Sequence, residues 1–128
     1  MEINNSPKAI CDTGHNVGGW KYLVPQIKAQ PSKQLRIVFG MVDDKDIDTV
    51  MNMLPKQAIY YWTQATTKRA VPADKVSDKA LQYGLSGHIY KSVKEAYSHA
   101  LAEADDADFI FIGGSSYIVA DLLSSVEK

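Results

Sequence analysis

The most informative segment of the chain is a polar turn that follows a short apolar run near the amino terminus. The run stops at Asp12, and a loop carrying His15 and Asn16 then leads through a pair of glycines into an amphipathic pattern. This order predicts a strand, a loop and the first turn of a helix. In open α/β sheets such a position binds anionic ligands, because the unpaired N–H groups of a helix start point outward. We therefore expect Asp12, His15 and Asn16 to belong to a binding site.

Three other polar segments follow apolar runs in the same way. They are the acidic and basic group at residues 43–46, the pair Lys68 and Arg69, and the Gly-Gly-Ser-Ser turn at residues 113–116. Ligands bind beyond the carboxyl ends of parallel strands, so these segments are expected to share one edge of the sheet with Asp12. Simpler interpretations stay open: a turn cap at Asp12, an ordinary helix start at residues 43–46, and a serine-capped turn at residues 113–116.

Apolar runs and helical spacing alternate five times along the chain. The strand candidates are residues 8–12, 35–40, 58–62, 88–91 and 109–113. Each is followed by apolar residues at helical spacing. Pro25 predicts that the first helix starts late or bends, and Ser92 with Glu95 forms a capping box before the fourth. The second and fifth runs are almost purely apolar, as in parallel strands buried on both faces. The sequence therefore predicts an α/β fold: a three-layer sandwich with a mostly parallel, Rossmann-like sheet of about five to six strands and helices on both faces.

Composition and charge narrow the functional classes. The chain has 128 residues, 45% of them hydrophobic, and a formal net charge of −1, which predicts one domain without a basic nucleic-acid footprint. No apolar run approaches the roughly 20 residues that span a bilayer, and the first eight residues lack the apolar region of a signal peptide. The single cysteine, Cys11, excludes an internal disulfide, is expected to be an inert packed thiol, and fits a cytoplasmic protein.

Several familiar motifs are missing from the sequence. There is no phosphate-binding loop, dinucleotide fingerprint or nucleophile elbow, and no Cys/His spacing predicts a metal site. A phospho-acceptor receiver domain is excluded, because the positions expected to hold its Asp and Lys are occupied by Thr63 and Gly113. His88 and His99 lie away from the predicted site, and we interpret both as structural or solvated.

Four segments together resemble the C-terminal domain of folylpolyglutamate synthases and dihydrofolate synthases, which belong to the Mur ligase superfamily. Residues 12–16 are similar to the family's D-x-x-H-N motif, residues 39–46 to F-G-x-x-x-D-K-D, residues 69–71 to R-A-[LV], and residues 111–117 to its final strand and G-S-x-[YF] turn. The match runs in order and spacing from about Lys8 to Leu123. Val17 in place of a proline, and Gly114 where Thr is frequent, depart from the pattern and leave the path of these two turns open.

The resemblance implies an activity that this chain cannot perform alone. Enzymes of this family use ATP and Mg²⁺ to phosphorylate a carboxylate on the folate substrate, and the amine of L-glutamate then attacks the acyl phosphate. Their phosphate loop and Mg²⁺ ligands lie in a larger N-terminal ATPase domain. We therefore expect residues 8–128 to be a Mur ligase-type C-terminal domain and residues 1–7 to be an appended segment or linker remnant. The implied partners are the ATPase domain, L-glutamate and folate, with no nucleic acid and no membrane.

The resemblance also implies roles for individual residues. Asp12, His15 and Asn16 would bind the nucleotide, and His15 with Lys45 would form the catalytic pair. The residues implied to hold glutamate are His15, Lys45, Arg69, Ser115 and Ser116. Charge-assisted hydrogen bonds from Lys, Arg or a helix start suit its two carboxylates. Two other functions stay open: a stand-alone nucleotide- or amino-acid-binding module without catalysis, and an interaction domain that does not need these residues.

Overall fold

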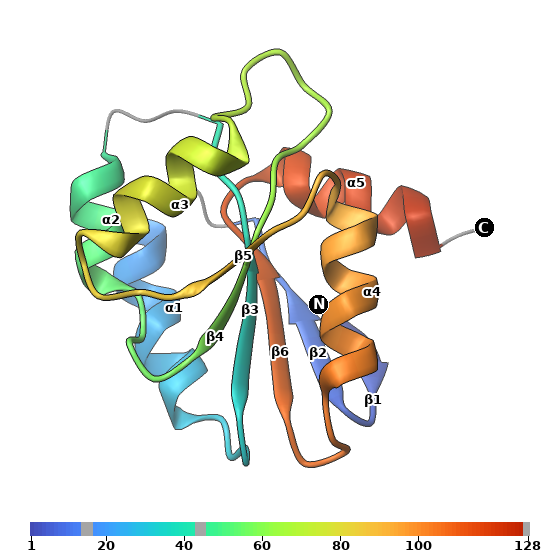
Figure 1. Ribbon diagram of the computed structural model, residues 1–128. Helices are drawn as coiled ribbons and strands as arrows, with labels where there is room; N and C mark the ends of the chain where they lie inside the picture. The colour runs from blue at the N-terminus through green and yellow to red at the C-terminus, as the bar shows by residue number, and fades with distance from the viewer. Residues whose placement is uncertain (14–16, 43–45, 127–128) are drawn as a thin grey trace.

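The computed structural model of the chain describes residues 1–13, 17–42 and 46–126. In these ranges six strands form one sheet: β1 (Glu2–Asn5), β2 (Lys8–Cys11), β3 (Leu35–Phe39), β4 (Ile59–Trp62), β5 (Gly87–Ile89) and β6 (Phe109–Gly113). The helices of the same ranges are α1 (Val17–Ala29), α2 (Ile47–Met53), α3 (Ala73–Leu81), α4 (Val93–Glu103) and α5 (Ser116–Val126). Helices cover both faces of the sheet (Figure 1), which confirms the predicted three-layer α/β fold.

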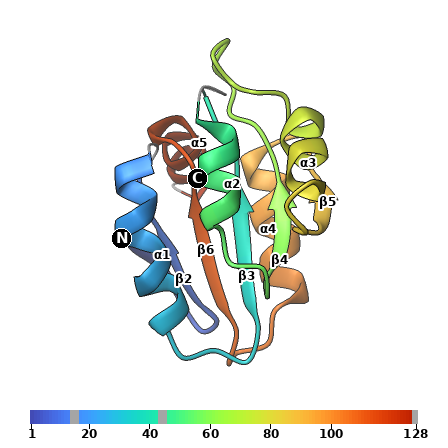
Figure 2. The same cartoon turned by 90° about the vertical axis from the view of Figure 1, so that its left-hand side faces the viewer.

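The strands lie in the order β1-β2-β6-β3-β4-β5, and every pair is parallel except β1 with β2. Helices α1, α2 and α3 pack on one face and α4 and α5 on the other (Figure 2). The chain therefore leaves β2 and β3 toward one face but leaves β6, which lies between them, toward the other. Such a switch in direction opens a crevice beyond the carboxyl ends of the strands, where ligands of open α/β sheets bind.

Each face of the sheet has its own apolar core. On the α1–α3 side, Trp20 contacts Phe39 and Phe111 with ring centroids 5.5 and 5.9 Å apart. On the α4–α5 side lie Val38 and Ile112, among others. Every residue of β6 is buried, which explains why its sequence carries no polar alternation. None of the helices in the described ranges is long and apolar enough to cross a bilayer.

Three local features differ from the sequence-based expectation or refine it. Residues 2–5, expected to be an appended segment or linker remnant, form the antiparallel edge strand β1. Helix α1 already begins at Val17, so a late start is wrong, and Pro25 lies inside the helix. Strand β5 begins one residue earlier than expected and ends at Ile89, which is exposed because β5 is the other edge of the sheet.

Two smaller expectations are confirmed. The Ser92 hydroxyl accepts a hydrogen bond from the backbone N–H of Glu95 at 3.1 Å, as a capping residue does. Cys11 is free and buried, and burial raises the pKa of its thiol. A protonated thiol is a poor nucleophile, so Cys11 is a packing residue of the α4–α5 core.

Candidate functional site at the carboxyl edge of the sheet

The segments that follow β2, β3, β4 and β6 converge at one edge of the sheet. Backbone hydrogen bonds join them in pairs: Asp12 N to Ile112 O (3.1 Å), Gly40 N to Gly113 O (3.3 Å) and Thr63 N to Phe39 O (2.9 Å). The sharing of one edge, expected from strand direction alone, is confirmed for the described parts of these segments.

Two glycines allow the loops after β3, β4 and β6 to touch. Gly114 has a φ of +120°, and a Cβ added there would lie 1.8 Å from the carbonyl oxygen of Gly40. A Cβ added at Gly40 would lie 2.7 Å from the carbonyl oxygen of Thr63. Any side chain at Gly114 or Gly40 would separate these backbones. At this edge the main chain of the loops after β3, β4 and β6 is therefore closely packed.

The turn between β6 and α5 presents two serines in different environments. Ser115 is buried, and its hydroxyl accepts a hydrogen bond from the backbone N–H of Ile118 at 3.2 Å. This is the geometry of a helix cap, the simpler interpretation that the sequence left open. Ser116 is exposed at the first position of α5. Of the two, Ser116 is the one whose hydroxyl faces solvent.

The connection from β4 to α3 is a basic loop, residues 63–72, with exposed Lys68 and Arg69. The guanidinium carbon of Arg69 lies 5.9 Å from the centre of the Tyr117 ring, in the first turn of α5. A cation over an aromatic face is attracted by the ring's quadrupole. The structure thus brings Arg69 beside the same helix start that carries Ser116, as strand direction predicted.

A second contact between this loop and α5 had not been anticipated. The carboxylate of Asp121 accepts two hydrogen bonds from Thr66, one from its backbone N–H at 2.9 Å and one from its hydroxyl at 3.1 Å. Nothing in the sequence pairs two residues 55 positions apart. The only available signal was that Tyr117 and Asp121 are four residues apart, and so share one face of a helix.

The structure describes only some of the other predicted residues. Asp12 is half-buried at the end of β2 and takes part in an interaction within the protein. His15, Asn16 and Lys45 lie outside the described residues. Asp46 precedes α2, and its side chain makes no capping hydrogen bond. His88 and His99 are exposed, and His99 lies 3.9 Å from Glu103.

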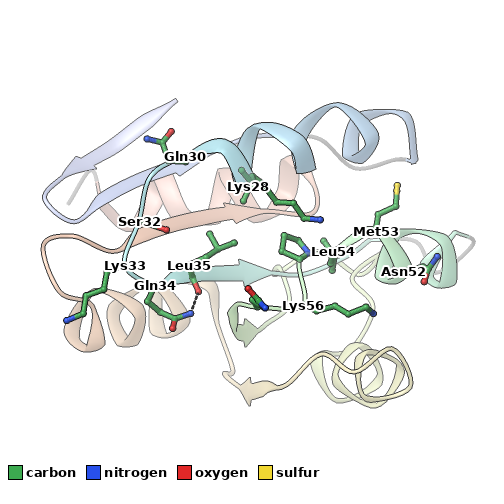
Figure 3. Close-up of a pocket in the computed structure, with 13 residues that line it drawn as sticks. Lys28, Gln30, Ser32, Lys33, Gln34, Leu35, Asn52, Met53, Leu54 and Lys56 are labelled. Carbon is green, nitrogen blue, oxygen red and sulfur yellow. Dashed lines mark hydrogen bonds between the residues drawn. The ribbon is translucent and has the colours of Figure 1, made fainter.

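A groove lined by described residues lies away from this edge. It has a volume of about 800 Å³ and is bounded by the end of α1, residues 30–35 and the segment that follows α2 (Figure 3). Its lysines are Lys28, Lys33 and Lys56, near the carboxyl ends of two helices, where positive charge is favourable. A smaller cavity of about 110 Å³ lies between β2, β6 and α1, and Asp12 is part of its wall.

Comparisons with known proteins fit this geometry. A model of the family described as the glutamate ligase domain of Mur ligases matches residues 1–116. The chain is 29% identical over 126 residues to the dihydrofolate synthase/folylpolyglutamate synthase of Escherichia coli K12, over 98% of this chain and 29% of that enzyme. The enzyme of the same description from Buchnera aphidicola is 28% identical over 129 residues, covering 98% of this chain and 30% of its own length.

Solved structures give the same result. Escherichia coli FolC in complex with ADP superposes with a TM-score of 0.87 at 27% identity, covering 98% of this chain and 30% of that one. A bifunctional folylpolyglutamate synthase/dihydrofolate synthase with Mn, AMPPNP and L-glutamate bound superposes with a TM-score of 0.84 at 25% identity, covering 100% of this chain and 31% of that one. The chain thus spans about 30% of the length of these relatives.

Proposed function

The chain belongs to the family of Mur ligase glutamate ligase domains, and we propose that it is the C-terminal domain of an ATP-dependent folylpolyglutamate synthase/dihydrofolate synthase. The complete enzyme would add L-glutamate to a folate through an acyl phosphate. The proposal is supported by the shared edge at which backbone hydrogen bonds join the ends of β2, β3, β4 and β6 and Arg69 lies over Tyr117, in a chain that matches this domain of the relatives.

The division of labour between two domains follows from what each can hold. Among the described residues of this chain, no three His, Cys, Asp or Glu side chains are grouped so as to hold a metal ion. The solved relatives that hold Mn and AMPPNP are about three times as long as this chain, so we assign Mg²⁺ and the phosphates of ATP to an ATPase domain of the same cytoplasmic polypeptide. Asp12, His15 and Asn16 would reach the nucleotide from the opposite wall of the cleft. The chain alone would not turn over ATP.

Binding of glutamate requires cations or hydrogen-bond donors for its two carboxylates. Arg69 supplies a guanidinium held over Tyr117, and Ser116 supplies an exposed hydroxyl at the start of α5. The first N–H groups of that helix add partial positive charge. Lys45, which precedes the first residue of α2 by two positions in the sequence, would supply a second cation. Ser115 would not contact glutamate directly. As the capping residue of α5, it would fix where that helix begins.

The test is a kinetic comparison in the polypeptide that carries this domain. Lys45→Ala is expected to raise the KM for glutamate by about tenfold or more, because a hydrogen bond to a charged group contributes about 1.5–3 kcal/mol, while the KM for ATP stays within about twofold. Lys94→Ala, which removes an exposed lysine on α4, is the matched control and should change neither constant. An unchanged KM for glutamate combined with a lost response to ATP would overturn the assignment of Lys45.

A further inference from the structure

Hydrogen bonds hold the basic loop near its base and also at Thr66, in its first half. At its base, the Val71 amide donates to Met41 O at 2.8 Å, and the Ala73 amide donates to Gln64 Oε1 at 2.9 Å. Between them, Thr66 is held by Asp121 of α5. The attachments at the base would keep the loop's ends in place without Asp121. The hydrogen bonds of Thr66 instead hold in place the part of the loop that carries Arg69.

A tight turn transmits this attachment to Arg69. The Ala70 amide donates to the carbonyl oxygen of Thr67 at 3.1 Å, and the Arg69 amide donates to the Thr67 hydroxyl at 3.3 Å. Four consecutive residues closed in this way move as a unit. Because Thr66 directly precedes the turn, fixing Thr66 fixes the direction in which the Arg69 side chain leaves the loop.

Helix α5 therefore contacts the basic loop twice on one face. Tyr117 lies under the Arg69 guanidinium, and Asp121, one turn later, accepts both hydrogen bonds from Thr66. Hydrogen bonds to a carboxylate are stronger than those between neutral groups, and a two-point attachment also fixes an angle. Ser116 starts the same helix. The spacing between Arg69 and Ser116 is thus set by one rigid element.

We propose that Asp121 is a positioning residue for amino-acid binding: by holding Thr66 it keeps the Arg69 guanidinium over Tyr117, beside the start of α5, before the substrate arrives. This role rests on the proposed function and deepens it, because it assigns the affinity for glutamate partly to a residue that does not touch it. A loop already ordered in its bound conformation spares the substrate the entropic cost of ordering it.

The experiment compares variants in the polypeptide that carries this domain. Asp121→Ala is expected to raise the KM for glutamate about tenfold, with the KM for ATP and the melting temperature nearly unchanged. Thr66→Val removes the hydrogen bond from the hydroxyl but keeps the one from the backbone N–H. It should raise the KM for glutamate about threefold. Asp121→Asn keeps an acceptor and should recover part of the loss. Asp106→Ala, an exposed acid in the turn before β6, is the control and should behave as wild type.

A second measurement reports on the loop itself. In the 128-residue chain, the ¹⁵N heteronuclear NOE of the Arg69 amide should fall in Asp121→Ala and stay high in Asp106→Ala, whether or not any ligand is present. A wild-type KM for glutamate in Asp121→Ala would overturn the positioning role while leaving the proposed function intact. A parallel rise of both KM values with a lower melting temperature would show a structural role instead. Wild-type enzyme without glutamate-dependent turnover would end the proposed function, and the positioning role with it.

Discussion

Arg36 illustrates how a single residue can hold two layers together. It projects from β3 and donates from Nε to the Asp108 carboxylate at 3.0 Å and from a terminal nitrogen to the Tyr61 hydroxyl at 2.8 Å. The Tyr61 hydroxyl in turn donates to Glu103 at the end of α4, at 2.7 Å. The side chains of Arg36 and Asp108 are only 11% and 2% exposed. Without Asp108, the buried guanidinium would keep Tyr61 and, as its carboxylate partner, Glu103 at 3.7 Å.

The contrast with a surface ion pair gives a direct prediction. Asp108→Ala should lower the free energy of unfolding by about 3 kcal/mol, since the guanidinium loses its buried carboxylate partner and keeps only the more exposed Glu103. Lys33→Ala breaks the pair between Lys33 and Asp105, which has a similar length of 3.0 Å but side chains 69% and 66% exposed. Loss of this exposed pair should lower the free energy of unfolding far less, because solvent and salt screen it. Urea unfolding of both variants checks this, and equal losses would show that burial does not decide the outcome.

Site residues could be predicted from sequence where strand direction alone decides their place. Arg69 and Ser116 follow different strands, and the rule that ligands bind beyond carboxyl ends puts both at one edge. The bond between Thr66 and Asp121 could not be predicted, because it depends on how far the loop reaches back over α5. Loop paths are set by tertiary contacts and leave no periodic signal.

At the scale of elements, hydrophobic periodicity was sufficient for five strand–helix pairs. It failed at β1, whose sequence Glu-Ile-Asn-Asn is short and mostly polar. An edge strand needs only one neighbour and can be half solvated, so it lacks the apolar run that marks β3 and β6. Periodicity held in α1, where it predicted the four buried apolar residues, but the late start inferred from Pro25 was wrong, because the helix already begins at Val17. Burial of an apolar face outweighs one lost hydrogen bond.

Helix α5 separates the structural role of one serine from the proposed binding role of its neighbour. Ser115→Ala should lower the free energy of unfolding by about 1 kcal/mol, because the N–H of Ile118 loses its acceptor. Ser116→Ala should leave stability within about 0.5 kcal/mol but raise the KM for glutamate in the complete enzyme. Thermal unfolding and steady-state kinetics are to be measured on both variants. The reverse pattern would reassign the two hydroxyls.

Helices α2 and α3 are joined at the surface by a titratable group. The carboxylate of Asp48 accepts a hydrogen bond from the Tyr83 hydroxyl at 2.8 Å and lies 3.1 Å from the Lys79 ammonium. Hydrogen bonding to Tyr83, and then to Lys79, lowers the pKa of Asp48 below its usual 3.8. Its stabilising contribution is therefore present above that pH and is lost as the pH falls through the lowered value.

The effect of Tyr83 on the pKa of Asp48 can be tested without a stability measurement. Tyr83→Phe removes the largest cause of the shift, so the pKa of the Asp48 carboxyl should rise toward its ordinary value. Carboxyl ¹³C chemical shifts followed over an acid titration report it directly. Tyr22→Phe alters an exposed tyrosine on α1 and should leave the Asp48 curve unchanged. An Asp48 curve identical in Tyr83→Phe and wild type would mean that Lys79 alone carries the effect.

Across the whole molecule, the buried Arg36–Asp108 pair and the candidate site lie at opposite ends of the sheet. Near the start of β6 lie Asp108 and Asp105, with their partners Arg36 and Lys33. The other end carries close-packed glycines, the basic loop and the start of α5. Because additivity holds for distant, independent sites, substitution of Asp108 should change stability without changing substrate affinity, and substitution of Ser116 should do the reverse.

The same arrangement predicts how the chain behaves without a second domain. Its site is an edge made of loops, so ATP or glutamate bound there would lose the contacts of the opposite wall. Titration calorimetry of the 128-residue chain should therefore give dissociation constants no tighter than about 1 mM for either ligand, or about −4 kcal/mol, and no ATP turnover. Addition of the ATPase domain should tighten both, since each ligand then bridges two surfaces. Micromolar binding of either ligand by the chain alone would favour a self-sufficient binding module over a closing domain, because a complete site would then lie within these residues.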